Sequence, residues 1–271
     1  MSQFIAEDLG DMAVRWAAPI LESPGVQHLY TTRQGGVSRG EFESLNFRHT
    51  GDSPENIREN CVRAAALLGC DYEDIVRTRQ EHTDLIDVVH QWAPGMRIGF
   101  DNKQPSDGLV TNVPGVCLMG FYADCQLLMF YDKRNHAIGC VHSGWRGTAQ
   151  AIGEKTIALM KKEYGTNPED LVCAIGPSIC QDCFETDRDV YDLFMARFGK
   201  EAERFCQVRG DKFHWDTKGL NFWRLTQAGV PPEQVAVSEE CTCCGEEKLW
   251  WSHRRQGTHR GVHAGLIALE R

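Results

Sequence analysis

Short apolar runs recur along this chain, and segments with helical spacing of apolar residues lie between them. Runs rich in β-branched and aromatic residues that end at Gly, Pro or Asn are typical of strands. Predicted strands cover residues 28–32, 75–78, 85–89, 117–121, 126–131, 136–141, 171–175, 234–237 and 249–252. Predicted helices cover residues 56–68, a stretch of about 15 residues ending at 164, 187–198 and 221–228. Such alternation is α/β or α+β, and we expect one α+β domain over residues 1–271, with mixed sheets flanked by helices.

The balance of charge excludes several classes of partner. The 271 residues carry a formal net charge of −9, whereas a nucleic-acid-binding surface needs clustered Lys and Arg. No run approaches the roughly 18 apolar residues that span a bilayer. The first residues, Met1 to Asp8, include acids where a signal peptide needs a basic start. We therefore expect a cytoplasmic protein without a nucleic-acid or membrane partner.

Twelve cysteines are many for a chain of this length. In a reducing compartment they are expected to be metal ligands, a nucleophile or small buried hydrophobic residues. Cys180 with Cys183, and Cys241 with Cys244, each form a C-x-x-C pair, and two such pairs can build a structural zinc site. The usual gap between the pairs is about 15–20 residues and here it is about 60, so the spacing favours separate buried thiols. A redox pair remains a further alternative.

Three other residues have the donor types of a catalytic metal site. His82, Cys125 and His142 each lie at the end of a predicted strand, where rigid elements present reactive groups. Two imidazoles and a thiolate are preferred zinc ligands, and three protein ligands leave a fourth position for water or substrate. Because these residues are far apart in the sequence, the prediction depends on the fold to bring them together.

Polar residues next to predicted strands are candidates for substrate contacts. Arg33 lies beside two glycines, and Arg146 lies at a strand-to-helix turn where a guanidinium and backbone N–H groups can hold phosphate. Asn46 offers an amide for a substrate hydroxyl or base, although Asn also suits turns. The alternative for either arginine is a surface ion pair. Trp250 and Trp251 are expected in the core.

An ordered set of motifs resembles the laccase-domain family, also called the multicopper polyphenol oxidase or peptidoglycan editing factor family. The decisive motif is His-Ser-Gly-Trp-Arg-Gly at residues 142–147. The others are Thr-Thr-Arg-Gln-Gly-Gly-Val-Ser at 31–38, Ser-Leu-Asn at 44–46, Gly-Asp at 51–52, Gln-Glu-His-Thr at 80–83, Asp-Gly-Leu-Val-Thr at 107–111, Ala-Asp-Cys at 123–125, Ile-Gly-Pro-Ser-Ile at 175–179, Cys-Thr at 241–242 and Ser-His-Arg-Arg at 252–255. The match covers nearly the whole chain. Thr83 replaces the usual Gly, and the segments around Cys180 and Cys243 are richer in cysteine than is usual, which leaves room for a second metal site.

The resemblance implies a cysteine-hydrolase-like α+β fold and a metal held by His82, Cys125 and His142. It implies zinc, with copper as a possible alternative, and bacterial members are described as purine nucleoside phosphorylases with adenosine deaminase activity. We therefore expect a nucleoside and phosphate as the small-molecule partners, with Arg33 and Arg146 on the phosphate and Asn46 on the nucleoside. Laccase chemistry is not expected, because a multicopper centre needs many more histidines in paired motifs.

Two alternative functions use the same residues. In a cysteine hydrolase acting on a peptidoglycan precursor, Cys125 is the nucleophile and His142 activates it. In a non-catalytic zinc-binding protein, metal is bound without turnover, and the open coordination position then has no purpose.

Overall fold

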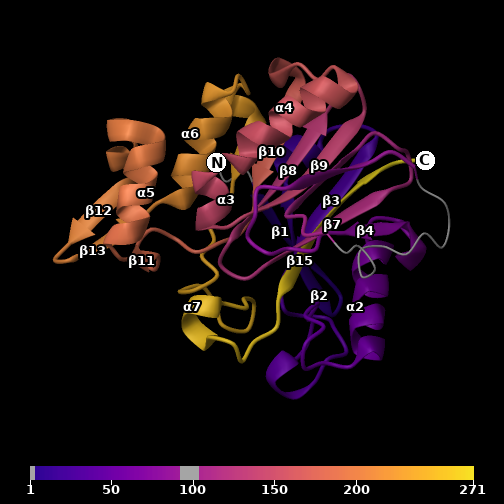
Figure 1. Cartoon of the computed structure of the whole chain (residues 1–271). Helices are drawn as coiled ribbons and strands as arrows, with labels where there is room; N and C mark the ends of the chain where they lie inside the picture. Colours follow the sequence, from indigo (N-terminus) through magenta and orange to yellow (C-terminus); the bar gives the residue numbers. More distant parts are fainter. Residues whose placement is uncertain (1–3, 92–103) are drawn as a thin grey trace.

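Two six-stranded β-sheets pack face to face, with helices on their outer faces (Figure 1). The computed structural model describes residues 4–91 and 104–271. The first sheet has the order β1 (Phe4–Leu9), β2 (Met12–Ala17), β3 (Val26–Thr31), β15 (His263–Leu269), β7 (Cys117–Tyr122) and β4 (Ile75–Arg77). Only the β4–β7 pair in this sheet is parallel.

The second sheet has the order β14 (Val235–Val237), β10 (Leu171–Ile175), β8 (Gln126–Asp132), β9 (Ala137–Ser143), β6 (Gly108–Thr111) and β5 (Ile86–Val89). Its outer pairs β10–β14 and β5–β6 are parallel, and its inner pairs are antiparallel. The expected α+β class with mixed sheets is therefore confirmed. Strands β8 and β9 form a hairpin whose turn is held by Asp132, since its carboxylate accepts the N–H groups of Arg134 and Asn135 at 2.9 Å.

The core between the sheets depends on two glycines that face one leucine. Gly120 of β7 and Gly265 of β15 are register partners in the first sheet. A Cβ atom at Gly265 would lie 2.4 Å from a methyl of Leu127 in the second sheet, and one at Gly120 would lie 2.5 Å from the other methyl. The absence of both side chains therefore allows the sheets to approach closely over the buried Leu127.

Amphipathic helices cover the outer faces. Helix α2 (Pro54–Ala66) packs on the first sheet, and α4 (Ile152–Tyr164) and α6 (Thr217–Gln227) pack on the second. Ser53 caps α2, since its hydroxyl accepts the N–H of Asn56 at 3.1 Å. The remaining helices are α1 (Ala18–Leu21), α3 (Trp145–Ala149), α5 (Arg188–Phe198), α7 (His253–Gln256) and the 3-10 helices η1 (Gly40–Phe42), η2 (Tyr72–Asp74), η3 (Pro168–Asp170), η4 (Gly199–Phe205) and η5 (Pro232–Gln234).

A small third sheet lies beside the main sandwich. It has the order β11 (Glu185–Thr186), β13 (Lys212–Trp215) and β12 (Cys206–Arg209), and α5 packs against it around the buried Phe194 and Trp215. Figure 1 shows this part in orange, projecting to one side of the two large sheets.

Most of the predicted elements are present, with two corrections. The predicted strand at 249–252 is wrong, because its backbone groups bind elsewhere: the Trp251 N–H donates to His263 Nε2 and the Leu249 carbonyl accepts from Arg33. The helix that ends at Tyr164 is preceded by a separate short helix, and Ala151 between them has a φ of 61°. Strands not predicted are β1, β2, β6, β11, β12, β13 and β15.

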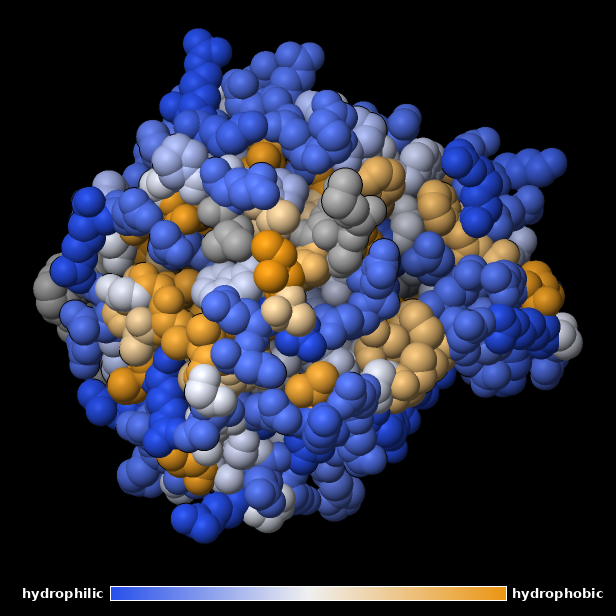
Figure 2. Space-filling model, turned by 180° about the vertical axis from the view of Figure 1, so that it is seen from behind, coloured by the Kyte–Doolittle hydropathy of each residue, from blue (hydrophilic) through white to orange (hydrophobic). Residues whose placement is uncertain are grey.

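In the view of Figure 2, groups of hydrophobic side chains are interspersed with hydrophilic ones. Within residues 4–91 and 104–271, no helix combines the length and the apolar character needed to cross a membrane. The predicted burial of the tryptophan pair is confirmed, since Trp250 and Trp251 are 1% and 0% exposed.

Candidate metal centre and active-site pocket

The three predicted ligands meet where the chain passes between the two sheets. His82 lies between β4 of the first sheet and β5 of the second, and Cys125 lies between β7 and β8. His142 lies in β9, opposite Leu127 of β8, so the β8–β9 register places it beside Cys125. One edge of the sandwich therefore brings together residues that are far apart in the sequence.

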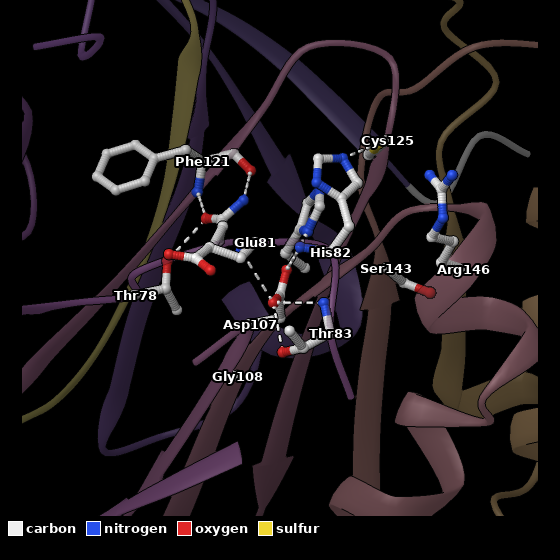
Figure 3. Close-up of polar contacts among 12 residues, drawn as sticks. Thr78, Glu81, His82, Thr83, Asp107, Gly108, Phe121, Cys125, Ser143 and Arg146 are labelled. Atoms are coloured by element: carbon white, nitrogen blue, oxygen red, sulfur yellow. Dashed lines mark hydrogen bonds and ion pairs between the residues drawn. The ribbon is translucent and has the colours of Figure 1, made fainter. Parts of the chain in front are cut away.

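The donor atoms of the trio lie within 4.8 Å of one another. The Cys125 Sγ is 3.9 Å from His82 Nε2, and the two imidazole rings meet edge to face with centroids 4.9 Å apart. Figure 3 shows the His82 ring turned toward Cys125. His142 is 3% exposed, whereas His82 is exposed to solvent and Cys125 is half-buried. The centre is therefore open on one side.

A buried carboxylate orients both histidines. Asp107, just before β6, accepts the Nδ1–H of His142 at 2.8 Å, which leaves His142 Nε2 for a ligand. The same carboxylate accepts the backbone N–H groups of Glu81, His82 and Thr83 at 3.2, 3.0 and 2.8 Å (Figure 3). The Thr83 hydroxyl adds a bond at 2.7 Å, so the residue that replaces the family's usual glycine strengthens this anchor.

A second buried carboxylate holds the segment next to Cys125. Asp124 accepts from the hydroxyls of Thr242 and Ser252 at 2.7 and 3.0 Å and from the Arg254 N–H at 2.6 Å. Asp124 and His82 both have a positive φ, 87° and 59°. Backbone in this region is strained for residues with a side chain and persists where surrounding contacts enforce it, which is common at functional sites.

Space beside the trio depends on a glycine. A Cβ atom at Gly144 would lie 2.9 Å from His82 Cδ2 and 3.1 Å from Cys125 Sγ. Gly144 also begins α3, because its carbonyl accepts the N–H of Thr148 at 2.8 Å. Only glycine therefore lets this helix start directly behind the donor atoms.

The charges of Cys125, His142 and Asp107 on one another favour a thiolate that faces an imidazolium. Burial alone would raise the pKa of Cys125, but the facing His142 and His82 outweigh it and lower that pKa to about 6. Burial alone would lower the pKa of His142, but Cys125 and Asp107 outweigh it and raise that pKa to about 9. The lowered pKa of Cys125 favours the deprotonated sulfur that zinc binds, and a bound ion would displace the proton from His142 Nε2.

The geometry fits a metal ion. Tetrahedral zinc, about 2.3 Å from sulfur and about 2.0 Å from nitrogen, separates two such donors by about 3.5 Å. The Cys125–His82 distance of 3.9 Å is near this value, and Asp107 is the kind of outer carboxylate that orients a metal-bound histidine. His82, Cys125 and His142 therefore suit one metal with an open position.

A pocket of about 500 Å³ is lined by His82 and Cys125 of the trio. Its walls combine aromatic and cationic side chains around the donor atoms. The lining residues are Glu81, His82, Ala123, Asp124, Cys125, Gln126, Gly144, Trp145, Arg146, Ile179, Phe184, Thr217, His253, Arg254 and Arg260. Such a pocket has the size of a small-molecule site.

Of the three predicted substrate residues, Arg146 lines the pocket, and Arg33 and Asn46 do not. Arg146 lines the pocket, and its guanidinium stacks 4.0 Å from the centre of the Trp145 ring. Arg33 does not line the pocket: it stacks on Trp251 at 3.6 Å and donates to the carbonyls of Glu43 and Glu247.

Asn46 is fully buried and its amide is used within the fold. Its oxygen accepts the N–H groups of Arg48 and Val262, and its nitrogen donates to Asp52 and to the Arg48 carbonyl. Because no donor or acceptor of Asn46 remains for a substrate, and because Arg33 does not line the pocket, we leave both residues out of the proposed site.

Several pocket residues were not singled out from the sequence. Arg260 is half-buried, and its buried Nε has no hydrogen-bond partner among the described residues. An unsatisfied guanidinium N–H at a pocket wall suits an anionic ligand. His253 and Arg254 also line the pocket, and the Ser-His-Arg-Arg motif is the signal in the sequence that could have identified them. Nothing in the residues around Arg260 distinguished it from a surface arginine.

Known proteins are similar to this chain over nearly its whole length. Residues 27–270 match the family model described as "Multi-copper polyphenol oxidoreductase laccase". The chain belongs to this family. A "Purine nucleoside phosphorylase" from Deinococcus radiodurans is 36% identical over 255 residues, covering 93% of this chain and 94% of that protein.

Two further relatives extend the comparison. "Adenosine deaminase RL5" from an unknown prokaryotic organism is 30% identical over 243 residues, covering 88% of this chain and 91% of that protein. The crystal structure of YlmD from Geobacillus stearothermophilus superposes with a TM-score of 0.89 at 29% identity, covering 100% of both chains. The expected family and fold are thus confirmed.

Proposed function

We propose that this chain is a metal-dependent purine nucleoside phosphorylase that also deaminates adenosine. In the first reaction a phosphate oxygen forms a bond to C1′ of the ribose, the bond from C1′ to the purine breaks, and the purine leaves with a proton. In the second, water replaces the amino group at C6 of adenosine and ammonia is released. The proposed nucleosides are adenosine, inosine and 5′-methylthioadenosine.

One observation carries this proposal: a single pocket combines two members of the metal-ligand trio, His82 and Cys125, with cationic side chains and aromatic walls, and the Arg260 Nε at this wall has no hydrogen-bond partner among the described residues. Arg146 and Arg260 can neutralise a phosphate, because a guanidinium binds phosphate oxygens in pairs. Trp145 and Phe184 offer flat apolar faces for a purine. The names of the relatives support the same reactions.

Each residue of the trio has a proposed role. His82, Cys125 and His142 would hold zinc, which supplies a Lewis acid that lowers the pKa of water near it. Asp107 keeps His142 Nε2 directed at the centre, and Asp124 holds the backbone beside Cys125.

Zinc is the proposed metal, and copper is the alternative for the same donors. The two candidate metal groups among the described residues contain only two histidines between them. Multicopper oxidation needs several paired histidines, so we do not propose laccase chemistry despite the name of the family model.

We further propose that residues 1–271 act as one catalytic domain in the cytoplasm, where the free thiol state of all twelve cysteines would persist.

A second candidate function rests on the thiolate–imidazolium pair. A cysteine hydrolase uses this arrangement, with Cys125 as the nucleophile and His142 as its base, and a peptidoglycan precursor would be the substrate. The same residues cannot bind zinc and attack a substrate in one state, so metal content separates the two functions.

The test compares purified wild-type protein with Cys125→Ala and His142→Ala. We expect each variant to contain one zinc ion fewer per chain than the wild type and to lose at least about 100-fold in phosphate-dependent release of hypoxanthine from inosine. Cys206→Ser, which removes a thiol outside the pocket, is the matched control and should keep both zinc and activity.

Unchanged phosphorolysis in His142→Ala with unchanged zinc would overturn the proposal. Covalent labelling of Cys125 by an acyl substrate in zinc-free protein, without nucleoside turnover in the zinc-loaded protein, would favour the hydrolase. Zinc bound by the trio without turnover of any of the three nucleosides would leave a non-catalytic binding protein.

A further inference from the structure

Four cysteines outside the pocket trio form a second group of closely spaced sulfur atoms. The Sγ atoms of Cys180, Cys183, Cys241 and Cys244 lie within 4.8 Å of one another. The distance between Cys180 Sγ and Cys244 Sγ is 3.8 Å. All four residues are free thiols in this structure.

The sheet explains how two pairs so far apart in the sequence meet. Strands β10 and β14 are parallel neighbours, with Ile175 opposite Val237, and each C-x-x-C pair follows one of these strands. Beyond the strands the alignment continues, because Ser178 pairs with Cys241 in a parallel bridge and the Thr242 N–H donates to the Ser178 carbonyl at 3.2 Å. The long gap that counted against a zinc site is therefore spanned by ordinary strand pairing.

Each pair is folded into a tight turn. The Cys183 N–H donates to the Cys180 carbonyl at 3.2 Å, and the Gly245 N–H donates to the Cys241 carbonyl at 2.9 Å. Each turn directs the two sulfur atoms of its own pair toward the sulfur atoms of the other pair. A C-x-x-C turn that presents both sulfurs to one ion is the repeated unit of structural zinc sites.

The surroundings of Cys241 favour a thiolate. Its Sγ accepts backbone N–H groups from Cys180, Cys243 and Cys244 at 3.2, 3.3 and 3.4 Å. The buried ammonium of Lys218 lies at the same segment, since it donates to the carbonyls of Ser238 and Glu240 at 2.8 and 3.0 Å. Backbone donors and a buried cation both compensate the negative charge that four thiolates around a divalent ion leave behind.

The distances distinguish a metal site from a disulfide. Sulfur atoms about 2.3 Å from a tetrahedral zinc ion are about 3.8 Å apart, which matches the Cys180–Cys244 distance. A disulfide needs about 2.05 Å between the sulfurs. A redox pair usually begins a helix after a strand, and neither cysteine pair lies in a helix here.

We propose that Cys180, Cys183, Cys241 and Cys244 bind a structural zinc ion, distinct from the metal of the pocket trio. Four protein ligands complete the tetrahedron, so this ion has no open position for a substrate. Each thiol loses its proton when it binds, and no cysteine changes its oxidation state.

The proposed ion supports one wall of the pocket. Ile179 and Phe184, which flank the first cysteine pair, both line the pocket. Arg254 of the same wall donates to the Cys183 carbonyl at 3.1 Å and to the Glu185 carbonyl at 2.8 Å. Zinc would therefore hold residues 176–184 and 241–245 together as a fixed support behind the pocket.

The experiment measures zinc per chain in purified protein kept under a reductant. Cys244→Ser should contain one zinc ion fewer than the wild type, whereas Cys243→Ser, its immediate neighbour outside the group, should contain as much as the wild type. Cys244→His restores a zinc ligand and should recover the lost ion, which a purely steric role for the thiol does not explain. The double variant Cys125→Ala/Cys244→Ser should contain two zinc ions fewer than the wild type. If it contains only one fewer, as Cys244→Ser does alone, the pocket trio binds no metal and the four-cysteine site stands.

Cobalt substitution gives a second measurement. The sulfur-to-cobalt charge-transfer bands of a four-thiolate site should persist in Cys125→Ala and disappear in Cys244→Ser. Equal zinc content in wild type, Cys243→Ser and Cys244→Ser would overturn the proposal. Alkylation of the denatured protein without reductant is the last check. If fewer than all twelve cysteines react, the protein contains a disulfide, and the proposal is overturned.

Discussion

Single carboxylates fix the geometry of the candidate site at the residue scale. Asp107 is fully buried and accepts bonds from the imidazole of His142 and from the backbone on both sides of His82. It touches neither the pocket nor a donor position for a metal, so it acts through the two histidines. We regard Asp107 as a positioning residue.

Replacing Asp107 with Asn tests this role. The amide presents one oxygen where the carboxylate presents two, and its NH₂ group faces the N–H donors of residues 81–83. We expect zinc affinity at the trio to fall about 10–100-fold, as is typical when the outer partner of a ligating histidine is removed. Competition with a chromophoric chelator measures the affinity.

Asp132→Asn is the matched control, because Asp132 is also buried and also accepts backbone N–H groups, but at the far end of the β8–β9 hairpin. It should lower the free energy of unfolding and leave zinc affinity unchanged. Equal zinc affinity in Asp107→Asn and wild type would mean that the carboxylate only stabilises the fold.

At the scale of elements, the junction of α3 and α4 carries local strain. Ala151 has a φ of 61°, where an L-residue other than Gly costs about 1–2 kcal/mol. Ala151→Gly relieves this cost while giving the unfolded chain more freedom, so we expect a net gain of about 0.5–1 kcal/mol in the free energy of unfolding. Urea denaturation measures it.

The same substitution in an ordinary helix should have the opposite sign. Ala158 is exposed in α4, and Ala158→Gly should cost about 1 kcal/mol. If both variants lose stability by the same amount, the left-handed conformation at Ala151 is not a source of strain.

Local signals in the sequence predicted the elements that carry the site. The strands before and after Cys125, β7 and β8, were predicted because their apolar runs are bounded by polar turns. Helix α2 was predicted from Ser53-Pro54 and from its helical spacing of apolar residues. The strand β15 was not predicted, since Gly265 interrupts its apolar pattern and only the packing over Leu127 explains that glycine. The segment at 249–252 looked like a strand because two tryptophans favour strands, but its backbone binds side chains from other segments.

The site was predictable where a motif carried it and unpredictable where only the fold does. His82, Cys125 and His142 stand in recognisable motifs, and the fold places their donor atoms together. Arg260 becomes part of the pocket through the path of the chain before β15, which no local pattern encodes. Asn46 suited a substrate contact by residue type alone, and its four internal hydrogen bonds appear only in the folded chain.

At the scale of the whole molecule, two buried histidines link stability to pH. His28 and His263 are 0% exposed, and each accepts a backbone N–H at Nε2, from Ala17 and Trp251, at 2.7 Å. Burial lowers the pKa of each to about 3. Between pH 6.5 and pH 3 the unfolded chain therefore takes up a proton on each histidine that the folded chain does not.

The free energy of unfolding should consequently fall as the pH falls below about 6.5, by at most about 1.4 kcal/mol per pH unit for each histidine, and should not depend on these groups above that pH. His28→Gln removes one of them and should flatten the slope, measured by urea denaturation between pH 4 and pH 7. Parallel slopes for wild type and His28→Gln would contradict a neutral His28 in the folded protein.

The positions of the metal ligands on the passages between the two sheets also set an order of events during folding. His82 follows a strand of the first sheet, His142 belongs to the second, and Cys125 lies on the passage between them. Their donor atoms cannot converge until β4, β7, β8 and β9 have paired and the two sheets have closed over Leu127. Pairing of such distant segments is the slow part of folding. We therefore expect the metal to bind at the trio only after the chain has folded. The supply of the ion then determines what fraction of the molecules is active, and it does not determine what fraction reaches the native state.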